Sequence, residues 1–177
     1  MKFSPFLILV LIGFSHYANA QTWVASSSSV SFSIKMLGSN VKGNFKGLKP
    51  NVQFQNDEPL NLSATVLTNT LDTDNSLRDK HLKEKEDFFQ VDKFPFLSMS
   101  STQITKINAT QYQGTFKITI KAITKVVKIP INFTKKEDKG MLMSEFTINR
   151  NDWNFGGSTM GMSDNVKVKI ILNLDKK

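Results

Sequence analysis

The sequence predicts an all-β fold, a single antiparallel barrel of about eight strands with a short helical insertion around residues 75–90. Three observations support this prediction. Apolar and polar residues alternate along most of the chain after Gln21, polar turns separate the alternating segments, and one charged stretch breaks the alternation. Alternation is the pattern of strands with one buried face and one wet face. About eight strands give a closed barrel whose interior is just large enough for one ligand.

Residues 1–20 are predicted to be a signal peptide that precedes this domain. Lys2 supplies the positive charge, an apolar run follows, and Ala18 and Ala20 frame a small-x-small cleavage site. The run is too short to span a bilayer, which takes about 20 apolar residues. A buried first helix or strand is the alternative. We therefore expect cleavage after Ala20, a mature domain over residues 21–177, and a periplasmic or secreted location.

The strands follow in order after the expected cleavage site. Each has inward-facing residues at every second position, and together the segments amount to about eight strands. Their inward positions are Val30, Phe32 and Ile34; Val41, Gly43 and Phe45; Val52 and Phe54; Leu62, Ala64 and Val66; Leu97, Met99 and Ser101; Tyr112, Gly114, Phe116, Ile118 and Ile120; Val127, Ile129, Ile131 and Phe133; Leu142, Phe146 and Ile148; and Val166, Val168, Ile170, Leu172 and Leu174. Polar turns that contain Gly or Pro separate several of them, at residues 47–50, 56–59, 135–140 and 156–164.

The stretch around residues 75–90 does not alternate. An Asp or Asn before it can cap a helix, and Leu77 and Leu82 have near-helical spacing. Phe88 and Phe89 follow in a second short turn, and Phe94 completes an aromatic cluster just before the next strand. We expect a short helical insertion that covers one end of the barrel, with its aromatic side chains as a plug or a lid.

Composition excludes several kinds of site. Cysteine is absent, so disulfides, thiol nucleophiles and Cys-ligated zinc sites cannot form. His81 is the single histidine after the signal peptide, which excludes metal sites built from several imidazoles. No nucleophile-elbow motif accompanies it. We therefore expect no metal, no cofactor and no enzymatic activity.

The positive charge is scattered along the chain. The net charge is +8, or +7 without Lys2, and lysines such as Lys117 and Lys167 stand between apolar strand residues. This pattern indicates the solvated outer face of half-buried strands and disfavours a nucleic-acid surface. Weak attraction to anionic lipid headgroups, and with it peripheral contact with a membrane, remains an alternative.

Four polar residues, His81, Arg78, Asp79 and Arg150, have either a structural role or a role in ligand contact. His81 is interpreted first as a hydrogen-bonding partner that fixes the insertion, for instance with Asp79 or Asp87. Contact with a ligand headgroup and, as the least supported alternative, catalysis on a lipid-like substrate are the other interpretations. Arg78 and Asp79 point about 100° apart on a helix, so they do not simply pair with each other. Arg150 ends an alternating strand, where we expect a bidentate bond to a carboxylate at the rim, and ligand contact is the alternative.

Taken together, these segments resemble the YceI-like family of exported, lipocalin-like proteins. The specific match is the block around the insertion, and the strand matches extend it in order over the mature chain. The matching segments are Asn69-Thr70-Leu71-Asp72-Thr73, Leu77-Arg78-Asp79-Lys80-His81-Leu82, Asp87-Phe88-Phe89, Phe94-Pro95, Val41-Lys42-Gly43-Asn44-Phe45, Gly114-Thr115-Phe116-Lys117-Ile118, Ile123-Thr124-Lys125 and Asn149-Arg150-Asn151-Asp152-Trp153.

The resemblance implies an eight-stranded lipocalin-like barrel around a long pocket for a polyisoprenoid or a similar amphiphile, with a role in storage, transport or stress protection. At about −0.3 kcal/mol per heavy atom, a chain of roughly 40 carbons would bind with about −12 kcal/mol. Periodicity alone does not separate a hollow barrel from a filled one. A filled barrel that acts as a stress-response or partner-binding module is therefore the alternative, and the oligomeric state, homodimer included, is left open.

Fifteen residues are our candidates for ligand contact. They comprise a barrel wall, an aromatic mouth and two polar groups. The wall is Phe32, Ile34, Phe45, Leu62, Val66, Leu97, Met99, Phe116, Ile118 and Phe146; the mouth is Phe88, Phe89 and Trp153; the polar groups are Arg78 and His81.

Overall fold

The computed structural model describes residues 22–157 and 159–177. The signal peptide expected for residues 1–20, with its cleavage site, lies outside the described residues. Among the residues described, no helix is long and apolar enough to cross a membrane.

The described chain forms ten strands, one α-helix and two short 3-10 helices. In order they are β1 (Trp23–Met36), β2 (Ser39–Phe45), β3 (Lys49–Gln55), β4 (Glu58–Leu67), η1 (Thr68–Thr70), β5 (Leu71–Asp72), α1 (Ser76–Glu84), β6 (Phe96–Lys106), β7 (Gln111–Ile120), β8 (Ile123–Lys136), β9 (Lys139–Asn149), η2 (Arg150–Trp153) and β10 (Met162–Lys176). The all-β class and the short helical insertion are confirmed.

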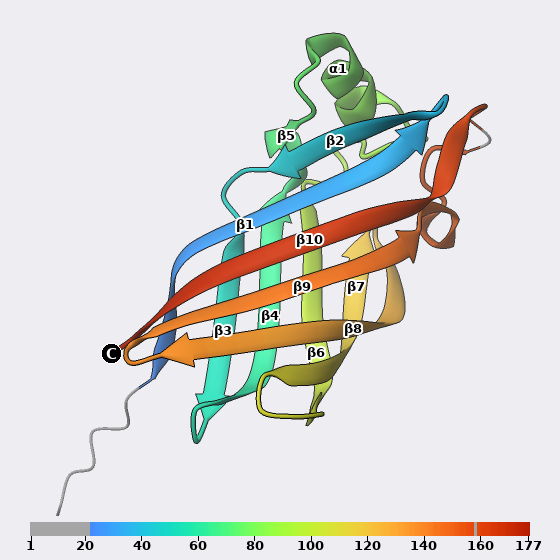
Figure 1. The fold of residues 1–177 in the computed structure, drawn as a ribbon. Helices are drawn as coiled ribbons and strands as arrows, with labels where there is room; N and C mark the ends of the chain where they lie inside the picture. Colours follow the sequence, from blue (N-terminus) through green and yellow to red (C-terminus); the bar gives the residue numbers. More distant parts are fainter. Residues whose placement is uncertain (1–21, 158) are drawn as a thin grey trace, which may run out of the picture.

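All ten strands belong to one antiparallel sheet in the order β3-β4-β6-β7-β8-β9-β10-β1-β2-β5. The sheet curls on itself into a half-barrel, so that β1, β10, β9 and β8 pass in front of β3, β4 and β6 (Figure 1). The expected count of eight strands is wrong. Each of the nine alternating segments forms its own strand, and β5 is a two-residue strand, too short for alternation to reveal.

The sheet has two edges, β3 and β5, and no backbone ladder joins β3 to β1 among the described residues. The Ser28 hydroxyl of β1 donates a hydrogen bond of 2.8 Å to the Leu48 carbonyl, just before β3. The seam between these two strands is therefore held by side chains rather than by paired backbone. This corrects the expectation of a closed barrel.

One end of the half-barrel is filled with side chains. We call it the closed end; it contains the β3–β4, β6–β7 and β8–β9 turns. Trp23 and Phe133 meet edge to face with 5.7 Å between ring centroids, and Phe54 lies 5.1 Å from Phe133. Phe116 folds over Gly114, where a Cβ would lie 2.2 Å from its ring. Such contacts leave little free volume at this end.

The other end, which we call the open end, contains the β1–β2 turn, α1, and the β7–β8 and β9–β10 connections. Along β10 the inward residues Leu172 and Leu174 at the closed end are buried, but Val166 and Val168 towards the open end are only half-buried. No residue of α1 is buried. The interior therefore changes from packed to hollow along the barrel axis.

A cluster of polar groups ties the closed end together. Asp57 in the β3–β4 turn accepts hydrogen bonds from the Trp23 indole N–H at 3.0 Å and from Lys176 at 2.9 Å, and Lys135 lies 3.3 Å away. The hydrogen bond from Lys176, with smaller contributions from Trp23 and Lys135, lowers the pKa of Asp57 to about 2. Three elements that are distant in sequence are thereby joined by one carboxylate.

Candidate functional site

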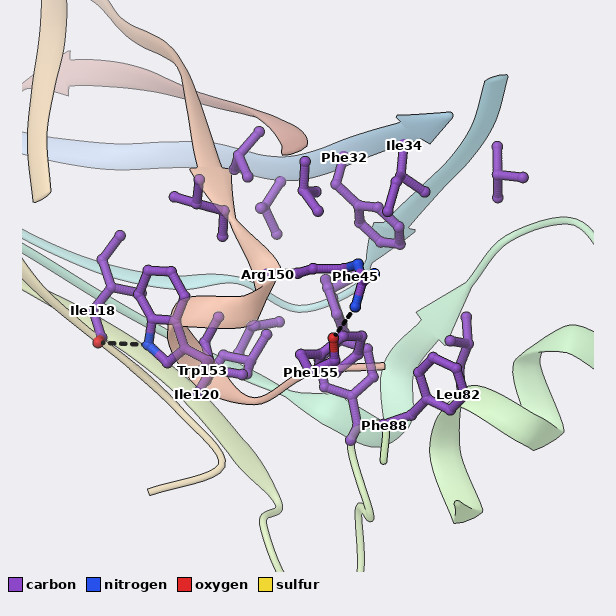
Figure 2. Close-up of a pocket in the computed structure, with 18 of the residues that line it drawn as sticks. Phe32, Ile34, Phe45, Leu82, Phe88, Ile118, Ile120, Arg150, Trp153 and Phe155 are labelled. Carbon is purple, nitrogen blue, oxygen red and sulfur yellow. Dashed lines mark hydrogen bonds between the residues drawn. The ribbon is translucent and has the colours of Figure 1, made fainter. Parts of the chain in front are cut away.

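The open end of the half-barrel encloses a cavity of about 590 Å³. Inward side chains of β1, β2, β4, β6, β7, β9 and β10 form its wall, and α1 and the loop before β10 lie around its rim (Figure 2). The lining is almost entirely apolar. A volume of this size lies within the usual range of ligand pockets, roughly 300–1,000 Å³.

A glycine in β2 shapes the wall at Phe32. Phe32 and Gly43 are opposite each other in the β1–β2 register, and a Cβ on Gly43 would lie 2.4 Å from the Phe32 ring. The ring therefore lies across Gly43 and reaches Phe45, with 5.7 Å between ring centroids. A larger residue at position 43 would push this ring into the cavity.

Three phenylalanines line the side of the cavity next to α1. The Phe89 ring lies 4.5 Å from Phe155 and 5.5 Å from Phe45, and Phe88 lies 5.5 Å from Phe155, all between centroids. Figure 2 shows Phe88 and Phe155 together between the barrel wall and the helix. Of the aromatic cluster expected for the insertion, Phe88 and Phe89 line the cavity but Phe94 does not. Phe155, from the loop after η2, lies against the other two rings instead.

Trp153 forms the floor of the cavity. It is 1% exposed, its indole N–H donates to the Ile118 carbonyl at 3.3 Å, and it also belongs to the packed core (Figure 2). We had expected Trp153 at the mouth, and this is wrong. The 3-10 turn after β9 carries the indole back into the barrel, where it lines the cavity and packs in the core at the same time.

Arg150 organises the loop that follows the floor. Its guanidinium donates to the backbone carbonyls of Phe155, Gly157 and Ser163 at 2.7–3.1 Å and to Asp164 at 3.2 Å. The expected bidentate bond to one carboxylate is therefore wrong. Its side chain is 5% exposed although Asp164 is 57% exposed, so loop carbonyls satisfy most of this buried charge.

Arg78 and Asp79 both bind Thr73, the buried threonine that precedes α1. Asp79 accepts from the Thr73 backbone N–H at 3.0 Å and from its hydroxyl, and Arg78 donates to the hydroxyl at 2.8 Å and to the carbonyl. Asn75 caps the helix by accepting from the Arg78 backbone N–H at 2.9 Å. These polar residues thus position the helix over the cavity, although Arg78 also reaches the lining.

His81 lies at the rim, exposed to solvent and adjacent to the cavity. Among the described residues its side chain makes no hydrogen bond, so the expected bonds to Asp79 or Asp87 are absent. Within the same residues, no group of three or more His, Cys, Asp or Glu side chains is arranged to hold a metal ion. The arrangement is suited to binding an apolar molecule with any polar end at the rim.

Thirteen of the fifteen candidate residues line the cavity. They are Phe32, Ile34, Phe45, Val66, Arg78, His81, Phe88, Phe89, Leu97, Met99, Ile118, Phe146 and Trp153. Leu62 and Phe116 do not reach it, because both point inward nearer the closed end and are buried in the packed core. The prediction that both residues face inward is confirmed, but alternation does not indicate how far along the barrel axis a residue lies.

Several lining residues were missed as candidates. Ile120, Ile148, Val166 and Val168 already stood on predicted inward faces, so only their depth was unknown. Phe155 had no such signal, because it follows a 3-10 turn and no periodicity applies there.

Comparison with known proteins agrees with this architecture. The family model of the YceI-like domain matches residues 22–174. A UPF0312 protein of Yersinia enterocolitica is 34% identical over 108 residues, which are 59% of this chain and 55% of that protein. The chain thus spans about half the length of this relative.

Two solved structures are similar in fold. BcnA from Burkholderia cenocepacia superposes with a TM-score of 0.77 at 22% identity, over 82% of this chain and 95% of that one. A polyisoprenoid binding domain from Saccharophagus degradans has a TM-score of 0.71 at 12% identity, over 89% and 99% of the two chains. At these identities the likeness concerns the fold alone.

Proposed function

This chain belongs to the YceI-like domain family, and on that premise we propose that it is an exported protein that binds one long apolar chain, such as a polyisoprenoid, in the cavity of its half-barrel. The observation that carries the proposal is the cavity itself, about 590 Å³ with an almost wholly apolar lining. A polyisoprenoid binding domain among the similar folds supports the ligand class.

The cavity volume sets the length of chain that fits inside. If each carbon occupies about the 30 Å³ that a water molecule occupies in the liquid, the cavity holds about 20 carbons. At about −0.3 kcal/mol per heavy atom, such a chain binds with about −6 kcal/mol, a Kd of tens of micromolar.

Binding rather than catalysis is proposed because the cavity presents few reactive groups. Arg78 is already bonded to Thr73, and His81 lies at the rim without a partnered acid among the described residues. A headgroup that contacts His81 would orient the ligand with its apolar end towards Trp153. Storage, transport or stress protection of such a lipid in the periplasm would follow from this binding.

The experiment is mass spectrometry of an organic extract of the purified mature protein, followed by uptake of geranylgeraniol, a 20-carbon isoprenoid alcohol. We expect a copurified lipid or saturable uptake. Met99→Asp, which puts a charge on the cavity wall, should reduce uptake at least about tenfold, because burying an unpaired carboxylate costs several kcal/mol. Ser100→Asp, the next residue of β6 with an exposed side chain, is the matched control and should bind as the parent does.

A stable protein that copurifies with no lipid and takes up no geranylgeraniol would contradict the proposal. That result would favour the alternative interpretation, in which the barrel is filled and the protein acts as a stress-response or partner-binding module.

A further inference from the structure

Three large apolar side chains protrude into solvent around the mouth of the cavity. Leu37 is 75% exposed, Leu77 is 66% exposed and Met160 is 88% exposed. They come from three separate elements: the β1–β2 turn, the first turn of α1, and the loop before β10. Single exposed apolar side chains are common on protein surfaces, so the informative feature here is that three of them gather at one end of the barrel.

The three tips surround one opening. The Leu37 backbone N–H donates to the Gly161 carbonyl at 2.8 Å, which fixes the β1–β2 turn beside Met160. Leu77 itself lines the cavity, and its neighbour Arg78 anchors the helix to Thr73. The tips therefore form an apolar rim, defined by Leu37, Leu77 and Met160, that continues the surface of the cavity outwards.

Charge at this end is nearly balanced. Segment 73–95 carries five basic and six acidic side chains, and Lys35 and Lys42 flank the β1–β2 turn. Electrostatic attraction to an anionic surface is therefore weak here, and the apolar rim is the main recognition feature.

We propose that the open end docks on a phospholipid bilayer, with the apolar rim inserted at the level of the headgroups. Three isolated tips do not form the continuous patch of roughly 800 Å² per partner that a stable protein interface needs. A bilayer requires no such shape complementarity, because apolar side chains enter it singly.

The ligand gives a second reason for a bilayer as the partner, and here the inference rests on the proposed function. Each methylene moved through water costs about 0.8 kcal/mol, so a long apolar chain exchanges far more readily from a membrane than through solution. A chain too long for the cavity would also leave its remainder between the rim residues, where the bilayer would cover it.

The test is flotation of the mature protein with phosphatidylcholine vesicles, with and without added phosphatidylglycerol. We compare the parent with the rim variant Leu37→Ser, Leu77→Ser, Met160→Ser and with the control variant Ile107→Ser, Leu60→Ser, Met141→Ser. The control residues are 62%, 47% and 39% exposed and lie next to the turns of the closed end. Uptake of geranylgeraniol without vesicles is measured in parallel.

We expect the rim variant to lose vesicle binding by about tenfold or more, because binding scales with inserted apolar area, and the control variant to bind as the parent does. A parent that does not float, or a rim variant that floats equally well, would overturn the docking proposal. A parent that takes up no geranylgeraniol without vesicles would instead count against the proposed function. Failure of the docking proposal and failure of the proposed function are therefore distinguishable.

Tryptophan fluorescence gives an independent measurement. Trp23 and Trp153 are each 1% exposed, so an indole placed at the rim would dominate any change in emission. Leu37→Trp should shift to shorter wavelength when vesicles are added, and Ile107→Trp should not. Equal shifts at both positions would show unspecific adsorption and would overturn the proposal.

Discussion

The two ends of the half-barrel use the same alternating strands to opposite effect. At the closed end Trp23, Phe54 and Phe133 fill the interior, and Asp57 joins the chain termini of the domain to a turn. At the open end the inward residues surround a cavity, several of them, such as Val166 and Val168, are only half-buried, and α1 has no buried residue. The comparison teaches that alternation fixes the inward face, whereas it does not record whether the interior at a given depth is full.

Truncating an aromatic side chain at each end gives the largest expected contrast. Trp23→Ala should lower the free energy of unfolding by about 3–5 kcal/mol, because it leaves a cavity in a packed core. Phe32→Ala should cost only about 1–2 kcal/mol, because its ring is half-buried and already faces empty space. Urea denaturation of both variants measures the difference, and equal losses would show that the two ends are packed alike.

Replacing Trp153 with a smaller residue should extend the cavity towards the closed end. Trp153→Leu removes the hydrogen bond to Ile118 and shortens the side chain, and we expect it to lower the free energy of unfolding by about 2–3 kcal/mol. The deepened cavity should favour longer chains. Competition among isoprenoid alcohols of about 15, 20 and 25 carbons tests this. An unchanged length preference would mean that Trp153 is not the floor for the ligand.

The smallest effect concerns the polar cluster at the closed end. Because folding lowers the pKa of Asp57 from 3.8 to about 2, its charged form is stabilised in the folded protein, and this contribution is fully present above pH 4. It is lost as the pH falls through about 2. The side chain is 31% exposed, so solvent screening limits the effect, and Asp57→Asn should cost about 1 kcal/mol at neutral pH.

The parent protein and the Asp57→Asn variant should become equally stable in acid. Urea denaturation at neutral pH and near pH 2 measures both values, and the open-end cavity should be unaffected. A stability difference that persists unchanged near pH 2 would show that the amide perturbs packing rather than charge.

Much of the fold was predictable from the sequence, because alternation is a direct consequence of a sheet with one wet face. All nine alternating segments form strands, and the charged stretch forms the short helix α1. The two-residue β5 and the unpaired seam were not predictable. β5 is too short for a period, and the seam depends on how far a sheet curls, which no local pattern records.

The sequence predicted which residues of the site face the interior of the barrel, but not how far along the barrel axis they lie. Met99 and Phe116 stand on equivalent inward positions, yet Met99 lines the cavity and Phe116 lies in the core. The orientation of Trp153 and the bonds of Arg150 depend on a 3-10 turn and a loop, where periodicity gives no information. Depth along a barrel is a property of strand stagger, which only the assembled sheet defines.

The seam between β1 and β3 has a consequence for selectivity. A barrel closed by a ladder has a fixed circumference, because widening it would break a row of backbone hydrogen bonds. Here the two strands are joined by the bond from Ser28 to the Leu48 carbonyl, so a small increase in girth disturbs side chains and leaves the described ladders intact. If the proposed ligand binds in the cavity, branched and straight chains of different thickness would share one scaffold, and discrimination between them would rest on length rather than on width.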